Sequence, residues 1–134
     1  MTARILIVED DDDLVNLATH WLERAGYAVE HAPDGQTALS LLKNKPLPTL
    51  VLLDVMLPKI DGFEVLRRMR ADARTQFIPV IVLTSSDEEH DVLNAYRAGA
   101  NSYIRKPVDF DAFMDATKQI GLYWLGLNET PVQR

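Results

Sequence analysis

Apolar residues along this chain fall into short runs that alternate with longer stretches of mixed polarity. Runs such as LVLL and VIVL are almost continuously apolar, which is typical of parallel strands covered on both faces. The pattern predicts five strands, at Arg4–Val8, Ala28–Ala32, Leu50–Leu53, Val80–Leu83 and Ser102–Ile104. Regular alternation of such strands with helices indicates an α/β fold with a doubly wound parallel sheet.

The stretches between the strands carry helical spacing and end signals. After the first strand, apolar residues recur at Leu14, Val15, Ala18, Leu22 and Ala25, and Gly26 suits the left-handed conformation that follows a helix. A short second helix begins near Asp34 and Gly35 and ends before Pro46 and Pro48. We predict a third helix from about Phe63 to Asp72, with Phe63, Leu66 and Met69 inward, and a fourth capped by Asp87 with Val92, Leu93 and Tyr96 at helical spacing.

Five consecutive acids, Glu9 to Asp13, follow the first strand. Neighbouring carboxylates repel, so a compensating dipole or cation is needed. Asp11 to Asp13 are explained by the start of the first helix, whose N-terminus favours acids. Glu9 and Asp10 stand before that helix, which leaves a metal site open for them.

Ligands of doubly wound sheets bind beyond the carboxyl ends of the strands. The residues at those ends are Glu9 with Asp10, Asp54, Thr84 and Lys106. Three converging carboxylates are relieved by a hard divalent cation, and Mg²⁺ suits a site of few carboxylates, waters and phosphate oxygens.

Asp54 is either a metal ligand only or also a nucleophile that attacks phosphorus and forms an aspartyl phosphate. Phosphoryl transfer depends on in-line positioning and on neutralisation of charge. Lys106 and the Thr84 hydroxyl would supply contacts to the phosphoryl oxygens. Taken singly, Lys106 is also explained as a solvated charge, and Thr84 as a hydroxyl bonded to local backbone.

Composition narrows the function classes. With 134 residues, nearly half of them apolar, the chain has the size of one domain. A net charge of −6 argues against nucleic acid as a partner, and no apolar run is long enough to span a membrane. No cysteine is present, and no basic and apolar leader begins the chain, so we expect a cytoplasmic protein.

Four motifs in this order, ILIVEDD, LLDVMLPKIDG, VIVLTSS and YIRKP, resemble the receiver domain of two-component response regulators over residues 4 to 125. The resemblance implies a flavodoxin-like sheet with strand order 2-1-3-4-5 and five helices. It also implies that a sensor histidine kinase phosphorylates Asp54 and that the protein is not an enzyme, although it assists its own phosphorylation and dephosphorylation. The implied Mg²⁺ ligands are Asp10, Asp54 and the backbone carbonyl of Met56, with Glu9 acting mainly through water.

The resemblance further implies a switch. Thr84 and Lys106 would contact the phosphoryl group, and Tyr103 would turn into the space that Thr84 leaves, unless it merely covers the sheet edge. Ser85 is small enough to keep the phosphate accessible, and a cis peptide is expected before Pro107. The output surface would be the fourth helix, fifth strand and fifth helix, which signal to a partner protein.

Other classes share parts of this pattern. A hydrolase of the haloacid dehalogenase type usually needs a second Asp two residues after the nucleophile, where Met56 stands. A flavodoxin-like electron carrier must cradle a phosphate in its first loop, where five acids would repel it. A receiver-like interaction module that works without phosphorylation remains the alternative function.

The C-terminal end suggests an assembly. We predict a receiver domain over residues 1–127 and a tail over 128–134 without an output domain. The ending KPVDFDAFMDATKQIGLYWLGLNE is similar to the small response regulators that pair with bacterial phytochromes. Phe110, Phe113, Ile120, Trp124 and Leu127 form one helical stripe, and Met114, Leu122, Tyr123 and Leu125 make other faces apolar. Such a helix predicts a homodimer, unless the tail folds back or docks on a kinase.

Overall fold

The computed structural model describes residues 3–44, 46–57, 59–84, 89–106 and 108–122, and it has alternating strands and helices throughout. The elements are β1 (Arg4–Val8), α1 (Asp12–Arg24), β2 (Ala28–Ala32), α2 (Gly35–Leu41), β3 (Leu50–Asp54), α3 (Gly62–Ala71), β4 (Val80–Thr84), α4 (Glu89–Arg97), β5 (Ser102–Arg105) and α5 (Phe110–Leu122). The five strands form one parallel sheet in the order β2-β1-β3-β4-β5. The predicted fold class and strand order are therefore confirmed.

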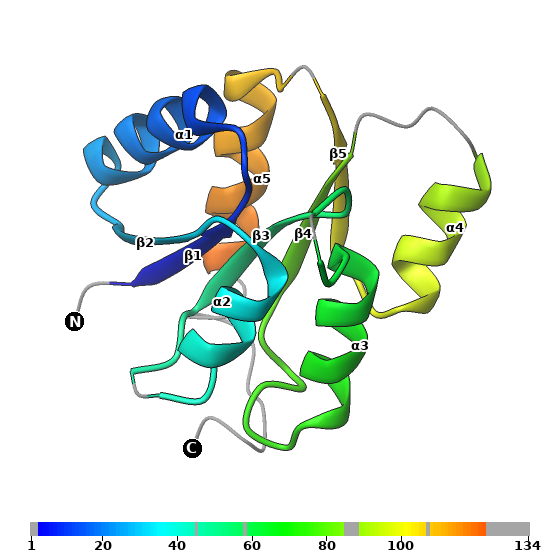
Figure 1. Ribbon diagram of the computed structural model, residues 1–134. Helices are drawn as coiled ribbons and strands as arrows, with labels where there is room; N and C mark the ends of the chain where they lie inside the picture. Colours follow the sequence, from blue (N-terminus) through cyan, green and yellow to red (C-terminus); the bar gives the residue numbers. More distant parts are fainter. Residues whose placement is uncertain (1–2, 45, 58, 85–88, 107, 123–134) are drawn as a thin grey trace.

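Helices cover both faces of the sheet (Figure 1). Successive residues of a strand point to opposite faces, so β1 sends Leu6 and Val8 into one core cluster and Ile5 and Ile7 into the other. The first cluster includes buried residues of α2, α3 and α4, and the second includes buried residues of α1 and α5. The sheet is thus a rigid middle layer that brings the ends of β1, β3, β4 and β5 to one edge.

The helix ends follow the local chemistry of the sequence. The Asp11 side chain caps α1 by accepting hydrogen bonds from the backbone N–H groups of Asp13 and Leu14. Gly26 follows α1 with a φ of 99°, a conformation that favours glycine. Both observations agree with the predicted helix, in which Asp11 to Asp13 form the start.

The structure differs from the prediction in detail. Strands β3, β4 and β5 each extend one residue further, to Asp54, Thr84 and Arg105, because backbone pairing continues past the last apolar residue. In α3 the buried apolar side chains are those of Val65, Leu66 and Met69, while Phe63 is only partly buried.

The fourth helix also differs from its apolar pattern. Leu93 and Tyr96 are about half exposed, and among the residues of this helix whose burial is described, Ala95 is the buried one. The predicted cap at Asp87 lies outside the described residues. Among the helices in the described part of the chain, none has the length and apolarity needed to cross a membrane.

Candidate functional site

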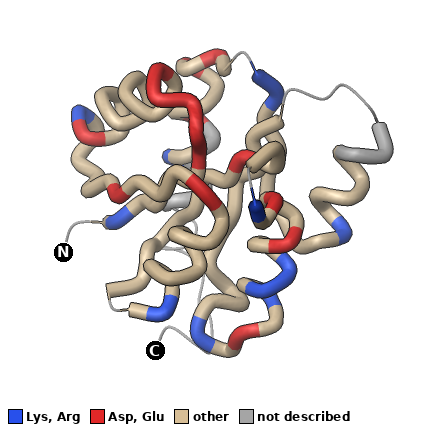
Figure 2. The backbone as a smooth tube through the Cα atoms, viewed as in Figure 1, with Lys and Arg blue, Asp and Glu red and all other residues tan. Residues whose placement is uncertain are grey.

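Three carboxylates meet at the carboxyl edge of the sheet. Glu9 follows β1 and Asp54 ends β3, and the pairing of Val8 with Leu53 places these strand ends side by side. Glu9 and Asp54 are buried, Asp10 is exposed, and each offers an oxygen within 4.8 Å of the others. In Figure 2 the acidic segment runs from the end of β1 into α1.

Lys106 provides the positive charge of this cluster. Its Nζ lies 2.6 Å from Glu9 Oε1 and 3.4 Å from Asp54 Oδ2. Its backbone N–H donates to the carbonyl oxygen of Thr84 at 2.8 Å, which holds the residue beside β4. Burial lowers the pKa of Lys106, but the hydrogen bond with Glu9 and the nearby carboxylate charges outweigh burial and raise it. Lys106 is therefore a fixed cation here and not a solvated surface charge.

Glu9 is fully buried, and its environment favours a bound proton. Burial raises the pKa of Glu9 to about 7, and the Asp54 carboxylate also raises it, whereas the hydrogen bond with Lys106 opposes the rise. The backbone N–H groups of Asp10 and Asp11 donate to Glu9 Oε2 at 3.0 and 3.2 Å. Without a metal cation, the single positive charge of Lys106 does not balance three ionised carboxylates, so a proton on Glu9 is favoured.

The loop after β3 is held close to Asp54. The backbone N–H of Met56 donates to Asp54 Oδ1 at 3.1 Å, while the Met56 side chain is 72% exposed. Gly62 begins α3 against this loop, and a Cβ at this position would overlap the carbonyl oxygen of Asp54 and lie 2.7 Å from the Val55 Cα. Glycine at residue 62 therefore allows α3 to start directly behind the site.

The remaining predicted site residues differ in where they lie. Thr84 is buried at the end of β4, next to the cluster along the sheet edge, because β4 pairs with β3. Tyr103 is partly buried in β5 and packs against the core cluster of α2, α3 and α4. Ser85 and Pro107, with the peptide bond that precedes Pro107, lie outside the described residues.

His31 also touches the site, although its sequence context did not indicate this. Its Nε2 lies 2.7 Å from the carbonyl oxygen of Glu9. Because β2 runs parallel to β1 and pairs His31 with Ile7, the histidine reaches the strand end that carries Glu9. The register of the two strands is the signal that identifies this contact.

The donor set fits a hard divalent cation. All three side chains offer carboxylate oxygens, two of these side chains are buried, and such oxygens are the ligands that Mg²⁺ prefers. A cation in the place of the Glu9 proton would balance the charge of the cluster.

This chain is similar to known proteins in both sequence and structure. The family model described as "Response regulator receiver domain" matches residues 5–118. The chain is 40% identical over 134 residues to the "Probable methanogenesis regulatory protein FilR2" of Methanothrix harundinacea, covering 95% of this chain and 86% of that protein. Several other curated relatives are longer proteins, of which this chain spans between 24% and 46%.

The chain is also similar to solved structures over nearly its whole length. The phosphorylated cyanobacterial phytochrome response regulator RcpA is 32% identical, with a TM-score of 0.81 over 98% of this chain and 99% of that one. The Mn²⁺-bound form of the response regulator Rcp1 is 32% identical, with a TM-score of 0.78 over 96% of this chain and 99% of that one.

Proposed function

Because this chain belongs to the family of response regulator receiver domains, we propose that Asp54 accepts a phosphoryl group from the phosphohistidine of a sensor histidine kinase. The observation that carries the proposal is the buried carboxylate of Asp54, which lies at a strand end beside two further carboxylates and the ammonium of Lys106. We place this exchange in the cytoplasm.

In the proposed reaction, an Asp54 carboxylate oxygen forms the new O–P bond while the P–N bond to the kinase histidine breaks. The bonding pair of the P–N bond returns to the imidazole. Asp10, Asp54 and the Met56 carbonyl would hold Mg²⁺, with Glu9 acting mainly through water, and the cation would neutralise phosphoryl oxygens. Lys106, already poised 3.4 Å from Asp54, and Thr84 would contact the transferred group.

A phosphoryl group with a charge of about −2 then acts on the neighbouring strand ends. Thr84 would move toward it, and Tyr103 would follow into the space that Thr84 leaves. Tyr103 is only partly buried, so a turn of its side chain would change the surface that α4, β5 and α5 present to solvent. We propose that this face signals to a partner protein, since a switch acts through two surface states of different affinity.

The sensor kinase is proposed to be phytochrome-like. The support is the similarity of the whole chain to RcpA, a phytochrome response regulator that was solved in its phosphorylated form. The similarity to Mn²⁺-bound Rcp1 supports a divalent cation in the acidic cluster.

We also propose a homodimer joined through the C-terminal helix. Phe113 is buried in its own domain, while Trp124 and Leu127 lie outside the described residues. Burial of about 600 to 800 Å² per subunit would make an interface of ordinary size. Two-fold pairing would cover the apolar faces predicted from Met114, Leu122, Tyr123 and Leu125. Sedimentation at micromolar concentration tests this: the wild type should sediment as a dimer, and Trp124→Glu with Leu127→Glu as a monomer. A dimer in the double variant would contradict the interface.

Intact-mass spectrometry after incubation with Mg²⁺ and a small phosphodonor such as acetyl phosphate tests the phosphoryl transfer. The wild type is expected to gain one phosphoryl group. Asp54→Asn should not gain it at the wild-type rate. Omission of Mg²⁺ should abolish the reaction. A wild type that stays unmodified with a cognate kinase and with the small donor would favour an interaction module that works without phosphorylation.

A further inference from the structure

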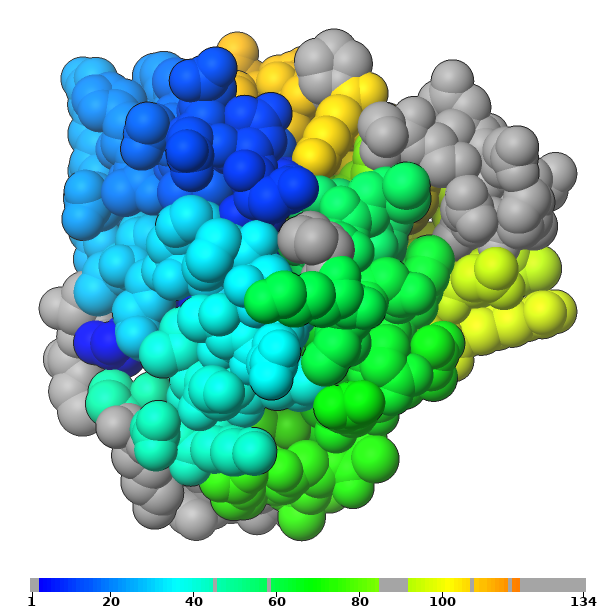
Figure 3. Space-filling model, in the orientation of Figure 1, coloured from blue at the N-terminus to red at the C-terminus, as the bar shows by residue number. Residues whose placement is uncertain are grey.

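A groove lies between α3 and α4, away from the acidic cluster. Phe63, Arg67 and Arg70 line it from α3, and the lining residues of α4 and the turn after it are Asn94, Arg97 and Ala98. Each set falls on one face of its helix, at spacings of three and four residues. The groove has a volume of about 490 Å³, and Figure 3 shows α4 beside α3 on this side of the molecule.

The groove is positive on a protein of net charge −6. Three arginines line it, and no carboxylate is among the described residues that do so. Arg97 forms no ion pair with any residue that the structure describes, and Glu64 divides its carboxylate between Arg67 and Arg68, at 3.0 Å from each. The arginines of α3 and α4 are visible as basic segments in Figure 2.

Arg70 shapes the groove without being available to a ligand. All five of its N–H groups donate within the protein: to the carbonyl oxygens of Gly99 (2.7 and 3.0 Å), Ile78 (2.7 Å) and Gln76 (3.1 Å), and to the Asn101 side chain (3.0 Å). No acid compensates this guanidinium among those partners. Arg70 therefore fixes the C-terminal end of α4 against α3 and adds a positive field. Arg97 is exposed and has no ion pair among the described residues, and Arg67 is exposed but shares the Glu64 carboxylate.

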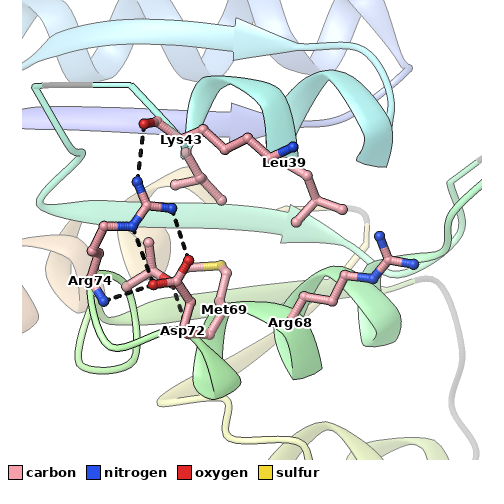
Figure 4. Close-up of a pocket in the computed structure, with 8 residues that line it drawn as sticks. Leu39, Lys43, Arg68, Met69, Asp72 and Arg74 are labelled. Atoms are coloured by element: carbon pink, nitrogen blue, oxygen red, sulfur yellow. Dashed lines mark hydrogen bonds and ion pairs between the residues drawn. The ribbon is translucent and has the colours of Figure 1, made fainter.

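A second hollow, of about 220 Å³ between α2 and α3, shows the contrast (Figure 4). There the Arg74 guanidinium is paired with the Asp72 carboxylate at 2.8 Å and donates to the Lys43 carbonyl oxygen at 3.0 Å. That arginine already has a carboxylate partner within the protein, and so does Arg67, whose Nη2 lies 3.0 Å from Glu64 Oε1. The groove between α3 and α4 has no such internal partner for Arg97.

We propose that the groove between α3 and α4 binds a short acidic segment of a partner protein. Guanidinium groups bind carboxylates through paired N–H donors, and clusters of arginine are a recurring means of recognising acidic motifs. The partly buried Phe63 offers apolar surface for a neighbouring apolar side chain of that segment. A nucleic acid is disfavoured because its long phosphate backbone would also meet the negative charge of the rest of this protein.

The experiment is an amide NMR titration of the unphosphorylated full-length chain. The probe is a synthetic octapeptide that alternates Asp and Glu with Leu and Phe, and its neutral twin carries Asn and Gln instead. We expect saturable shifts at residues 63, 67, 94 and 97 with the acidic peptide only, weakening as the salt concentration rises from about 0.02 to about 0.3 M.

Variants make the assignment specific. The double variant Arg67→Gln with Arg97→Gln should lower the affinity for the acidic peptide by about tenfold. The control Arg24→Gln with Lys43→Gln removes the same charge elsewhere and should leave the affinity within about twofold of the wild type. Equal losses in the two double variants, equal binding of the neutral twin, or an absence of shifts in the groove would overturn the proposal. Tighter binding of an oligothymidylate in the groove would also overturn it in favour of nucleic acid. Because no phosphodonor is present, these outcomes are independent of phosphorylation at Asp54.

Discussion

The protonation of Glu9 predicts how the stability of the metal-free protein depends on pH. The pKa of Glu9 rises from an ordinary value of 4.5 to about 7, chiefly because the side chain is buried. The native state thus binds this proton more tightly than the unfolded chain does. The resulting stabilisation is complete below pH 4.5 and is lost as the pH rises through 7.

The magnitude follows from the same two values. A tenfold change in proton affinity is worth about 1.4 kcal/mol, so a rise from 4.5 to about 7 corresponds to about 3 kcal/mol, of which about 2 to 3 kcal/mol is lost between pH 5 and pH 8. Glu9→Gln removes the titrating group. Relative to this variant, the wild type in EDTA should therefore lose about 2 to 3 kcal/mol of unfolding free energy over that interval.

Urea unfolding followed by far-ultraviolet circular dichroism at several pH values measures this difference, since other titrating groups contribute nearly equally to both proteins. Asp12→Asn is the control because it removes an acid from the exposed first turn of α1, and its curve should run parallel to that of the wild type. Saturating Mg²⁺ should flatten the wild-type dependence, since the cation replaces the proton. Parallel curves for the wild type and Glu9→Gln in EDTA would refute the reasoning.

Three further outcomes are expected. Asp10→Asn should weaken Mg²⁺ binding in a fluorescence titration by at least about tenfold without altering the circular dichroism spectrum, because it removes a proposed ligand that is exposed. An unchanged affinity would count against Asp10 as a ligand. Lys106→Ala and Thr84→Ala should still be phosphorylated but should lack the amide shifts of α4 and β5, and wild-type shifts in both would defeat the switch. Gly62→Ala should lower the unfolding free energy by about 2 to 3 kcal/mol, because the new Cβ would overlap backbone atoms. Gly26→Ala should cost about 1 kcal/mol, because its Cβ meets no atom within 4 Å and only the positive φ is unfavourable. Equal losses would contradict the packing argument.

The sequence was sufficient to predict the sheet and the residues at its carboxyl edge. Apolar runs mark buried parallel strands, and a parallel sheet must bring their carboxyl ends to one edge, so Glu9, Asp10 and Asp54 could be expected together. The last residue of each strand could not be predicted as well. Asp54 and Thr84 are polar, yet backbone pairing includes them in β3 and β4.

The individual side-chain contacts could not be predicted from the sequence. The pairing of Lys106 with Glu9 at 2.6 Å depends on the direction of two side chains from strands that are not adjacent. Arg70 resembles other charged residues of an amphipathic helix, but its partners are mainly carbonyl oxygens, which every residue type supplies. Residue types alone therefore do not reveal the groove between α3 and α4.

The position of the phosphoryl group tests the central claim most directly. Borohydride reduces an aspartyl phosphate to homoserine, so reduction of the phosphorylated protein followed by peptide sequencing in the mass spectrometer identifies the modified residue. The account predicts homoserine at residue 54 and at no other acid. Homoserine at residue 10, at another acid, or at none in a protein that has gained the phosphoryl mass would contradict it.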